Sequence, residues 1–142
     1  MADKKIHVEI VTPYELFYEG DADQLILPAV DGEIGIMPGH SPVIVALNPG
    51  EIRLTKEGRV LYIAASDGYA QIEIDNAIVV TGSAEWPEQI DLNRANLALQ
   101  RAEEKINSPG TSLEKVLRGK RAIMRAKARV KVAKRLTEKR EI

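Results

Sequence analysis

The stretch Asp31–Val43, DGEIGIMPGHSPV, decides how the first part of this chain folds. It places three glycines, two prolines and a histidine around the apolar residues Ile34, Ile36 and Met37. Glycine permits positive φ or a close backbone approach, whereas proline fixes φ and removes a backbone donor. We therefore predict a bent β segment at a sheet edge and not a helix. It is not a phosphate-binding loop, because no Gly-Lys-Ser/Thr follows the glycines.

The sequence on both sides of this stretch has the pattern of short strands. Ile6, Val8 and Ile10 alternate with polar residues, as do Ile72 and Ile74, which places every second side chain in a core. Short apolar runs suited to buried strands are separated by turn signals: Leu25–Val30, Val43–Leu47, Val60–Ala65 and Ala77–Thr81. Many short strands at spacings of roughly 8–12 residues favour an antiparallel sandwich or barrel.

The pattern changes to helical after Trp86-Pro87. Apolar residues then recur at steps of three and four, which predicts the packed face of a helix: Leu92, Ala95, Leu99, Ala102 and Ile106. Asp91 is a natural N-cap for this helix, and Asn107-Ser108-Pro109-Gly110 ends it.

A second helix is expected to begin at Thr111, which forms a capping box with Glu114. Its predicted apolar side is formed by Leu113, Val116, Leu117, Ile123, Met124, Val130 and Ala133. The short loop should fold the two helices into an antiparallel hairpin. Many alanines in this hairpin bury little area each, so we expect a partner or ligand to be able to open it. The predicted class is thus α+β: an N-terminal antiparallel β-sandwich, residues 1–88, followed by a C-terminal two-helix hairpin, residues 89–142.

The two halves carry opposite charge. Residues 1–88 contain 5 Lys+Arg and 15 Asp+Glu, a net charge of −10, whereas residues 89–142 contain 15 and 6, a net charge of +9. Such halves are expected to face different partners or one another.

Composition excludes several classes of function. The chain has no cysteine, and its two histidines, His7 and His40, are far apart, so we expect no metal site. No apolar run approaches the ~18 residues of a membrane span, so membrane association is expected only through partner proteins. Serines, acids and histidines are scattered among turns, and we predict no catalytic residues.

Four motifs together resemble one family. GEIGIMPGHSPV, VTP at Val11–Pro13, DG at Asp67–Gly68 and IDLNRA at Ile90–Ala95 occur in the order typical of the epsilon subunit of the F-type ATP synthase. The resemblance implies a flattened ten-stranded sandwich and a subunit that is not catalytic. It also implies that the segment containing Glu33 and His40 docks on the gamma subunit and the c-ring. On their own, these two residues suit a solvated loop acid and a histidine satisfied in a turn.

The hairpin carries arginines in positions suited to a polyphosphate. Arg94 and Arg101 share one face of the first helix, and Arg125 and Arg129 share a face of the second. In epsilon subunits that bind ATP, the I-D-x-x-R-A motif and arginines at these places hold the nucleotide. The resemblance therefore implies ATP as a regulatory ligand, with no other cofactor, held by Glu85, Asp91, Arg94, Arg101, Arg125 and Arg129. Alternatively, Asp91 only caps the helix and the arginines are solvated.

A run of cations marks the second helix, including Arg118, Lys120 and Arg121. It suits a solvated helix face, a surface for nucleic acid, or a surface for an acidic protein. The lack of interleaved aromatics and the acidic sandwich argue against nucleic acid. The resemblance implies contact with acidic segments of the catalytic beta subunits.

These expectations combine into one function. We predict a non-catalytic central-stalk subunit of the proton-translocating rotary ATP synthase, which couples the stalk to the c-ring and inhibits ATP hydrolysis through its hairpin. Its partners would be the alpha, beta and gamma subunits and the c-ring, at the cytoplasmic face of a bacterial plasma membrane. The alternative is a stand-alone acidic β domain whose cationic tail binds nucleic acid or an acidic protein.

Overall fold

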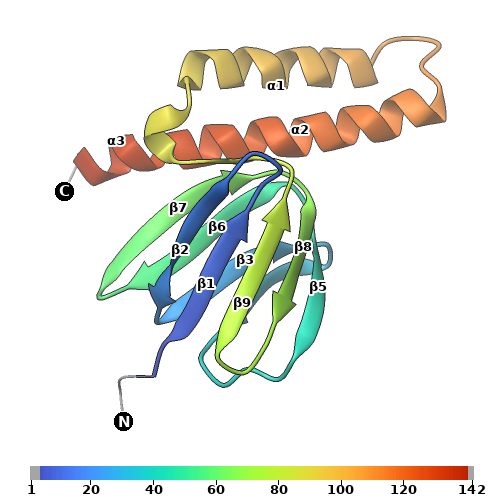
Figure 1. Cartoon of the computed structure of the whole chain (residues 1–142). Helices are drawn as coiled ribbons and strands as arrows, with labels where there is room; N and C mark the ends of the chain where they lie inside the picture. The colour runs from blue at the N-terminus through green and yellow to red at the C-terminus, as the bar shows by residue number, and fades with distance from the viewer. Residues whose placement is uncertain (1–3, 141–142) are drawn as a thin grey trace.

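A computed structural model describes residues 4–140 and confirms the predicted α+β architecture. Figure 1 shows a β-sandwich with a helical hairpin lying across one end, α2 (Leu113–Ala133) against the sandwich and α1 (Leu92–Ile106) outside it. A six-residue helix, α3 (Arg135–Arg140), continues from α2, and a 3₁₀ turn, η1 (Pro87–Gln89), precedes α1. Within the described residues the strands are β1 (Ile6–Val11), β2 (Leu16–Ala22), β3 (Gln24–Ala29), β4 (Gly32–Ile36), β5 (Val43–Leu47), β6 (Gly50–Lys56), β7 (Arg59–Ala65), β8 (Gly68–Ile72), β9 (Asn76–Thr81) and β10 (Ala84–Glu85).

The strands form one folded sheet in the order β10-β7-β6-β3-β5-β8-β9-β1-β2, with β4 paired to β3 beside this path. The pairs are antiparallel except β1 with β9, which are parallel. A parallel pair needs a long connection, and the strands between β1 and β9 supply it. The predicted antiparallel sandwich is thus confirmed, with β1 and β9 as its one parallel pair among the described strands.

The segment Asp31–Val43 folds as its glycines and prolines predict. β4 forms an edge hairpin with β3, in register from Leu25↔Ile36 to Ala29↔Gly32. Gly32 and Gly39 adopt φ of 125° and 86°, which glycine reaches without the clash of a Cβ. Ile36 is fully buried and Met37 is exposed, so the chain turns out of the sandwich directly after β4.

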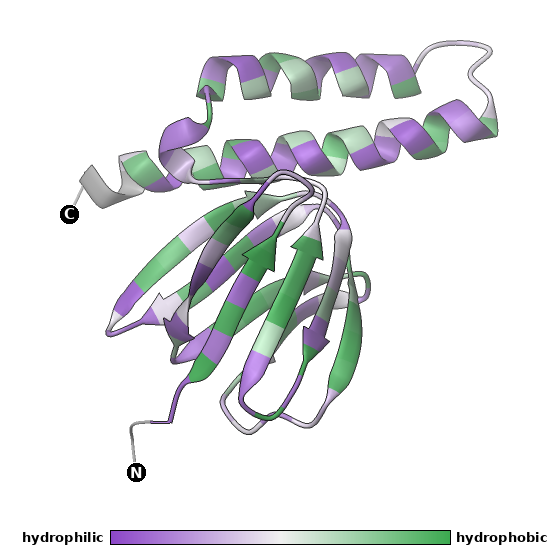
Figure 2. Ribbon diagram, in the orientation of Figure 1, coloured by the Kyte–Doolittle hydropathy of each residue, from purple (hydrophilic) through white to green (hydrophobic). Residues whose placement is uncertain are grey.

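The principal core lies inside the sandwich. Ile6, Val8 and Ile10 are fully buried, as their alternation predicts, and Ile72 is also buried. Ile74 lies beyond the end of β8 and is exposed, so the prediction of its burial is wrong. Figure 2 shows the contrast between the halves: β5 and β9 are largely green, whereas both helices alternate between purple and green.

The helices begin close to their predicted starts. The Asp91 side chain accepts a hydrogen bond from the backbone N–H of Arg94 at 3.1 Å, which confirms it as the N-cap of α1. The predicted capping role of Thr111 is wrong, because Ser112 caps α2 by accepting from the N–H of Lys115. The Thr111 hydroxyl instead donates to the carbonyl of Ser108 at 2.6 Å, which turns it back into the loop.

The buried side of α2 agrees with the predicted one only in part, because Val130 and Ala133 are buried and Val116, Ile123 and Met124 are half-buried. Leu113 and Leu117 are exposed, because the first part of α2 projects beyond the sandwich. The buried residues are small and lie towards the C-terminal end: Ala126, Ala128, Val130, Val132 and Ala133. In residues 4–140 no helix combines the length and the apolar character that crossing a membrane requires.

Candidate functional site

The candidate functional surface lies where α2 meets the sandwich and α1. A second apolar cluster joins the two halves there, composed of Ala64, Ile90, Ala95, Val130, Val132 and Ala133 with Tyr62 and Leu92 at its margin. Most of these residues are small, so each contributes little buried area. Charged groups around the cluster therefore carry a large share of the specificity of this contact.

Two carboxylates flank this cluster in one row across the sheet. Glu51 on β6 pairs with Ala64 on β7, and Ala64 pairs with Glu85 on β10. Each of the two acids binds an arginine from the C-terminal helices. The acidic sandwich and the basic hairpin thus meet in ion pairs.

Glu51 is the more deeply buried of the two acids, with a side chain only 1% exposed. Arg135 donates to it twice, from Nε and from one terminal nitrogen, each at 2.9 Å. Arg53 donates at 3.2 Å and the Lys131 ammonium lies 3.7 Å away. Burial raises the pKa of Glu51, but hydrogen bonds and charge from Arg135, with Arg53 and Lys131, outweigh it and lower that pKa overall. Glu51 therefore stays ionised.

Glu85 binds Arg129. Nε of Arg129 donates to one carboxylate oxygen at 2.8 Å and a terminal nitrogen donates to the other at 3.3 Å. Both side chains are about one-third exposed. These two residues of the predicted nucleotide site are therefore brought together by the fold, as partners of each other. With Arg125 they line a small pocket of about 40 Å³.

A larger pocket of about 810 Å³ lies between α1 and α2 near their connecting loop. Its size falls within the range of small-molecule sites. Two residues of the predicted nucleotide site, Arg101 and Arg125, line it from opposite helices. Three further cations line this pocket that the sequence did not assign to the nucleotide site: Lys105, Lys115 and Arg118. Their positions at successive turns of the two helices were the available signal.

The other predicted nucleotide residues lie elsewhere. Asp91 caps α1, and the Arg94 side chain is exposed and lines neither of these two pockets. The structure thus separates Asp91 and Arg94, at the start of α1, from the other four residues. Arg125 links these four, because it lines the larger pocket with Arg101 and the small pocket with Glu85 and Arg129.

The residues proposed for partner contact are exposed or nearly so. Arg118 pairs with Glu114 one turn earlier, at 2.7 Å, and Lys120 and Arg121 are exposed. On the sandwich, Glu33 accepts a hydrogen bond from Arg53 at 3.0 Å. The Nδ1 atom of His40 lies 2.8 Å from the carbonyl of Ser41, which suits a histidine held in a turn.

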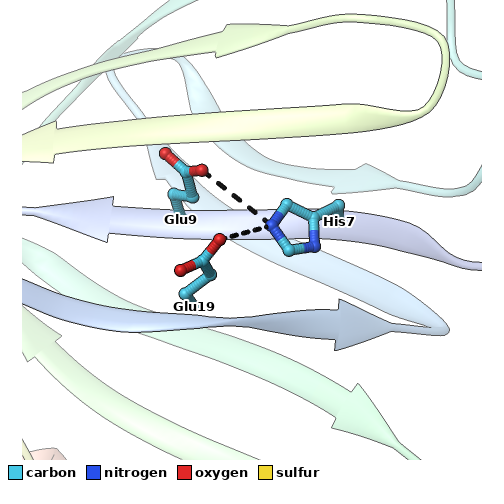
Figure 3. A group of neighbouring side chains, drawn as sticks. All are labelled: His7, Glu9 and Glu19. Atoms are coloured by element: carbon cyan, nitrogen blue, oxygen red, sulfur yellow. Dashed lines mark hydrogen bonds and ion pairs between the residues drawn. The ribbon is translucent and has the colours of Figure 1, made fainter.

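A further charged group lies on β1 and β2, away from the helices. His7 and Glu9 face Asp21 and Glu19 across the strand pair. His7 Nδ1 lies 2.9 Å from Asp21. Figure 3 shows the other ring nitrogen, Nε2, which lies 3.0 Å from Glu19 and 3.9 Å from Glu9. The ligand atoms of His7, Glu9 and Glu19 lie close enough to surround an ion, although the sequence predicts no metal site. The hydrogen bonds of His7 to Glu19 and Asp21, with the ion pair between His7 and Glu9, already account for the arrangement.

Comparisons with known proteins agree with this fold. Residues 5–87 match the model described as "ATP synthase, Delta/Epsilon chain, beta-sandwich domain". Residues 88–134 match "ATP synthase, Delta/Epsilon chain, long alpha-helix domain". The chain is 37% identical over 128 residues to the ATP synthase epsilon chain of Ruminiclostridium cellulolyticum, covering 90% of this chain and 95% of that one. It is 35% identical to the epsilon chain of Caldanaerobacter subterraneus, covering 96% and 99%.

A solved structure shares the fold at lower identity. A chain in the Euglena gracilis mitochondrial ATP synthase, in a complex titled OSCP/F1/c-ring, superimposes with a TM-score of 0.79 at 21% identity, covering 90% of this chain and 81% of that chain. The protein therefore belongs to the delta/epsilon family of ATP synthase chains. Within this family it is similar to the epsilon chains, which are non-catalytic subunits, as the sequence predicted.

Proposed function

We propose that this chain is a central-stalk subunit that couples the stalk to the c-ring and restrains ATP hydrolysis. Its similarity to bacterial epsilon chains over most of its length supports this proposal over a stand-alone binding module. The sandwich would dock on the gamma subunit and the c-ring through the segment that carries Glu33 and His40. The complex would lie at the cytoplasmic face of a bacterial plasma membrane, and the chain would reach the membrane only through its partners.

The hairpin is the proposed inhibitory element. One observation carries this proposal: α2 contacts the sandwich through small residues near its C-terminal end, while its N-terminal half projects outward with exposed cations. A contact of small apolar area can be exchanged for another partner at modest cost. In an open state the exposed face, with Arg118, Lys120 and Arg121, would contact acidic segments of the catalytic beta subunits. The charge complementarity would also make this contact dependent on salt.

ATP is the proposed ligand that favours the compact hairpin. The cation-lined pocket between α1 and α2 supports this, because its arginines can bind phosphate oxygens with two parallel hydrogen bonds. Arg101 and Arg125 would bind the polyphosphate first. Arg129, Arg94, Asp91 and Glu85 would complete the site after a local rearrangement. By linkage, ATP that prefers the compact state must weaken inhibition by the same free energy.

Two changes to the assembled complex test the inhibitory role. Removing residues from Leu113 onward should raise ATP hydrolysis while leaving synthesis largely intact. Reversing Arg118, Lys120 and Arg121 to glutamate should have the same effect, because like charges would then repel the acidic partner. Reversal of Arg59, an exposed cation on β7, is the matched control and should leave hydrolysis unchanged. Unchanged hydrolysis in both test variants, at full occupancy of this chain in the complex, would refute the inhibitory role.

A further inference from the structure

The spacing of two acids on the sheet matches the spacing of two arginines on the helix. Glu51 and Glu85 lie on either side of Ala64, two strands apart, which is about 10 Å at ~4.8 Å per strand. Arg129 on α2 and Arg135 on α3 are six residues apart, which is about 9 Å at 1.5 Å per residue, because Lys134 between the two helices keeps helical φ and ψ of −67° and −17°. Each arginine can therefore reach one acid without distorting the helix or the sheet.

The residue midway between the two arginines packs the helix against the sandwich. Val132 is fully buried and belongs to the same apolar cluster as Ala64. At 3.6 residues per turn, Arg129 and Arg135 lie about 60° to either side of Val132. The small side chain of Ala64 leaves room for the helix between the two acids. The C-terminal end of the hairpin is thus fixed at three points across three strands.

The two ion pairs differ in their surroundings. Glu85 is 29% exposed and borders a pocket with Arg125, whereas Glu51 is 1% exposed and lines neither that pocket nor the larger one. The Arg135 guanidinium also lies over the ring of Tyr62, 4.4 Å from its centroid, which adds a cation–π contact. Neither Glu51 nor Arg135 is among the residues proposed for nucleotide binding.

We propose that Glu51 and Arg135 form a clasp, independent of nucleotide, that holds the C-terminal helix on the sandwich and sets how readily the hairpin opens. This inference rests on the proposed function in one respect, namely that the hairpin has an open state. Removal of one partner from a buried ion pair is costly because the other charge is left unpaired. Arg53, on the same strand as Glu51, stays beside it when the helix departs. The positive charge of Arg53 partly compensates the Glu51 carboxylate in the open state, so the clasp can open and close reversibly.

Hydrogen exchange in the isolated full-length chain without nucleotide tests the clasp. The readout is the exchange rate of the α2 amides around Val130 and Val132, compared with amides of Val8 and Val79 in the sandwich core. Glu51→Gln and Arg135→Gln should each accelerate exchange in α2 about ten- to a hundredfold and leave the core amides unchanged. The double variant should exchange little faster than either single variant, because the second change removes a contact that is already lost. This cycle separates the contact from every other interaction of either side chain.

Glu73→Gln is the matched control, since it neutralises a sandwich acid that hydrogen-bonds Gln71 and not the helices. Its α2 exchange should equal that of the wild type. If Glu51→Gln unfolds the sandwich, the Arg135→Gln variant alone tests the clasp, because Arg135 lies outside the sandwich. Unchanged α2 exchange in Arg135→Gln, or fully additive effects in the double variant, would overturn the clasp. Neither result bears on inhibition in the assembled complex, which the removal of residues from Leu113 onward measures separately.

Discussion

Arg129 donates two hydrogen bonds to Glu85, at 2.8 and 3.3 Å, although the two residues lie 44 positions apart in the sequence. Both belong to the proposed nucleotide site. A phosphate and a carboxylate present similar pairs of acceptor oxygens to a guanidinium. A phosphate bound to Arg129 must therefore compete with Glu85 or share the guanidinium with it. Arg101 and Arg125 line an open pocket, so a phosphate can bind them without competing with Glu85.

The arginines should consequently differ in their contribution to ATP affinity. Arg101→Ala and Arg125→Ala should each weaken binding about ten- to a hundredfold, because each removes charge-assisted hydrogen bonds worth roughly 1.5–3 kcal/mol. Arg94→Ala should cost less, since this side chain is exposed and lies outside both pockets. Isothermal titration calorimetry on the isolated chain measures all three.

Arg59→Ala, which removes an exposed cation from the sandwich, should bind ATP as the wild type does. A larger loss for Arg94→Ala than for Arg101→Ala would contradict the placement of the phosphates in the open pocket. No heat from the wild type at millimolar ATP would leave the arginines as solvated surface charges.

Gly119 is the point of close approach between α2 and α1. A Cβ at this position would lie 2.6 Å from Cγ1 of Ile106, whereas carbon atoms pack at about 3.5–4.0 Å. Gly119→Ala should therefore loosen the hairpin near its loop. At the same time alanine should stabilise the α2 helix itself by about 1 kcal/mol. We expect unchanged or higher helix content by circular dichroism and faster hydrogen exchange in the last turn of α1.

Lys120→Ala introduces the same residue at the next position, which is exposed, and is the control for this variant. It should leave exchange in α1 unchanged. Equal exchange in Gly119→Ala and the wild type would show that Ile106 moves aside at no cost.

The elements that the sequence predicted are those with a regular apolar period or a short continuous apolar run. Ile6, Val8 and Ile10 defined β1, and the steps of three and four defined α1. β2 was missed because it is an edge strand without alternating apolar burial: Leu16 is exposed and its one buried residue is Ala22. β6 carries an alternation at Ile52 and Leu54, which is the sequence signal for this strand.

The ion pairs at the site could not be predicted, because sequence position does not say which acid meets which cation. Glu51 follows a turn and resembles any solvated acid, and Arg135 is one cation in a run, yet they meet across 84 residues. The N-cap of α2 could likewise not be chosen from the sequence alone. Thr111 and Ser112 are both good N-caps, and in the structure Ser112 caps α2 while the Thr111 hydroxyl donates to the carbonyl of Ser108 in the loop.

The sandwich should fold without the hairpin. Its principal core lies among strand residues, whereas of the cluster under α2 only Ala64 and Tyr62 come from the strands. A chain truncated after Glu88 should therefore show a dispersed NMR spectrum and a cooperative thermal transition. It should also retain binding to the gamma subunit. The transition temperature should fall, because truncation exposes Glu51 and removes its partners on the helices.

Glu51→Gln in the truncated chain tests whether the loss of the helix partners of Glu51 lowers the transition temperature. The substitution should cost less stability there than in the full-length chain, since only the Arg53 contact remains to be lost. An unfolded fragment would show instead that the hairpin belongs to the folding unit of the sandwich.

His7 should make the stability of the sandwich depend on pH. Hydrogen bonds to Asp21 and then Glu19 raise the pKa of His7 above its usual value near 6.5. The protonated form is thus favoured in the folded state, and its contribution is fully present below the pKa of the unfolded chain. That contribution is lost as pH rises through the raised pKa of the folded protein. Urea unfolding of the wild type and His7→Gln should therefore give a difference in unfolding free energy that is larger at pH 5.5 than at pH 8.5. Comparing the two proteins at each pH cancels the opposite trend of Glu51 and Asp23, whose lowered pKa values favour the folded state at higher pH. A difference that does not change with pH would show that the carboxylates beside His7 leave its protonation unaffected.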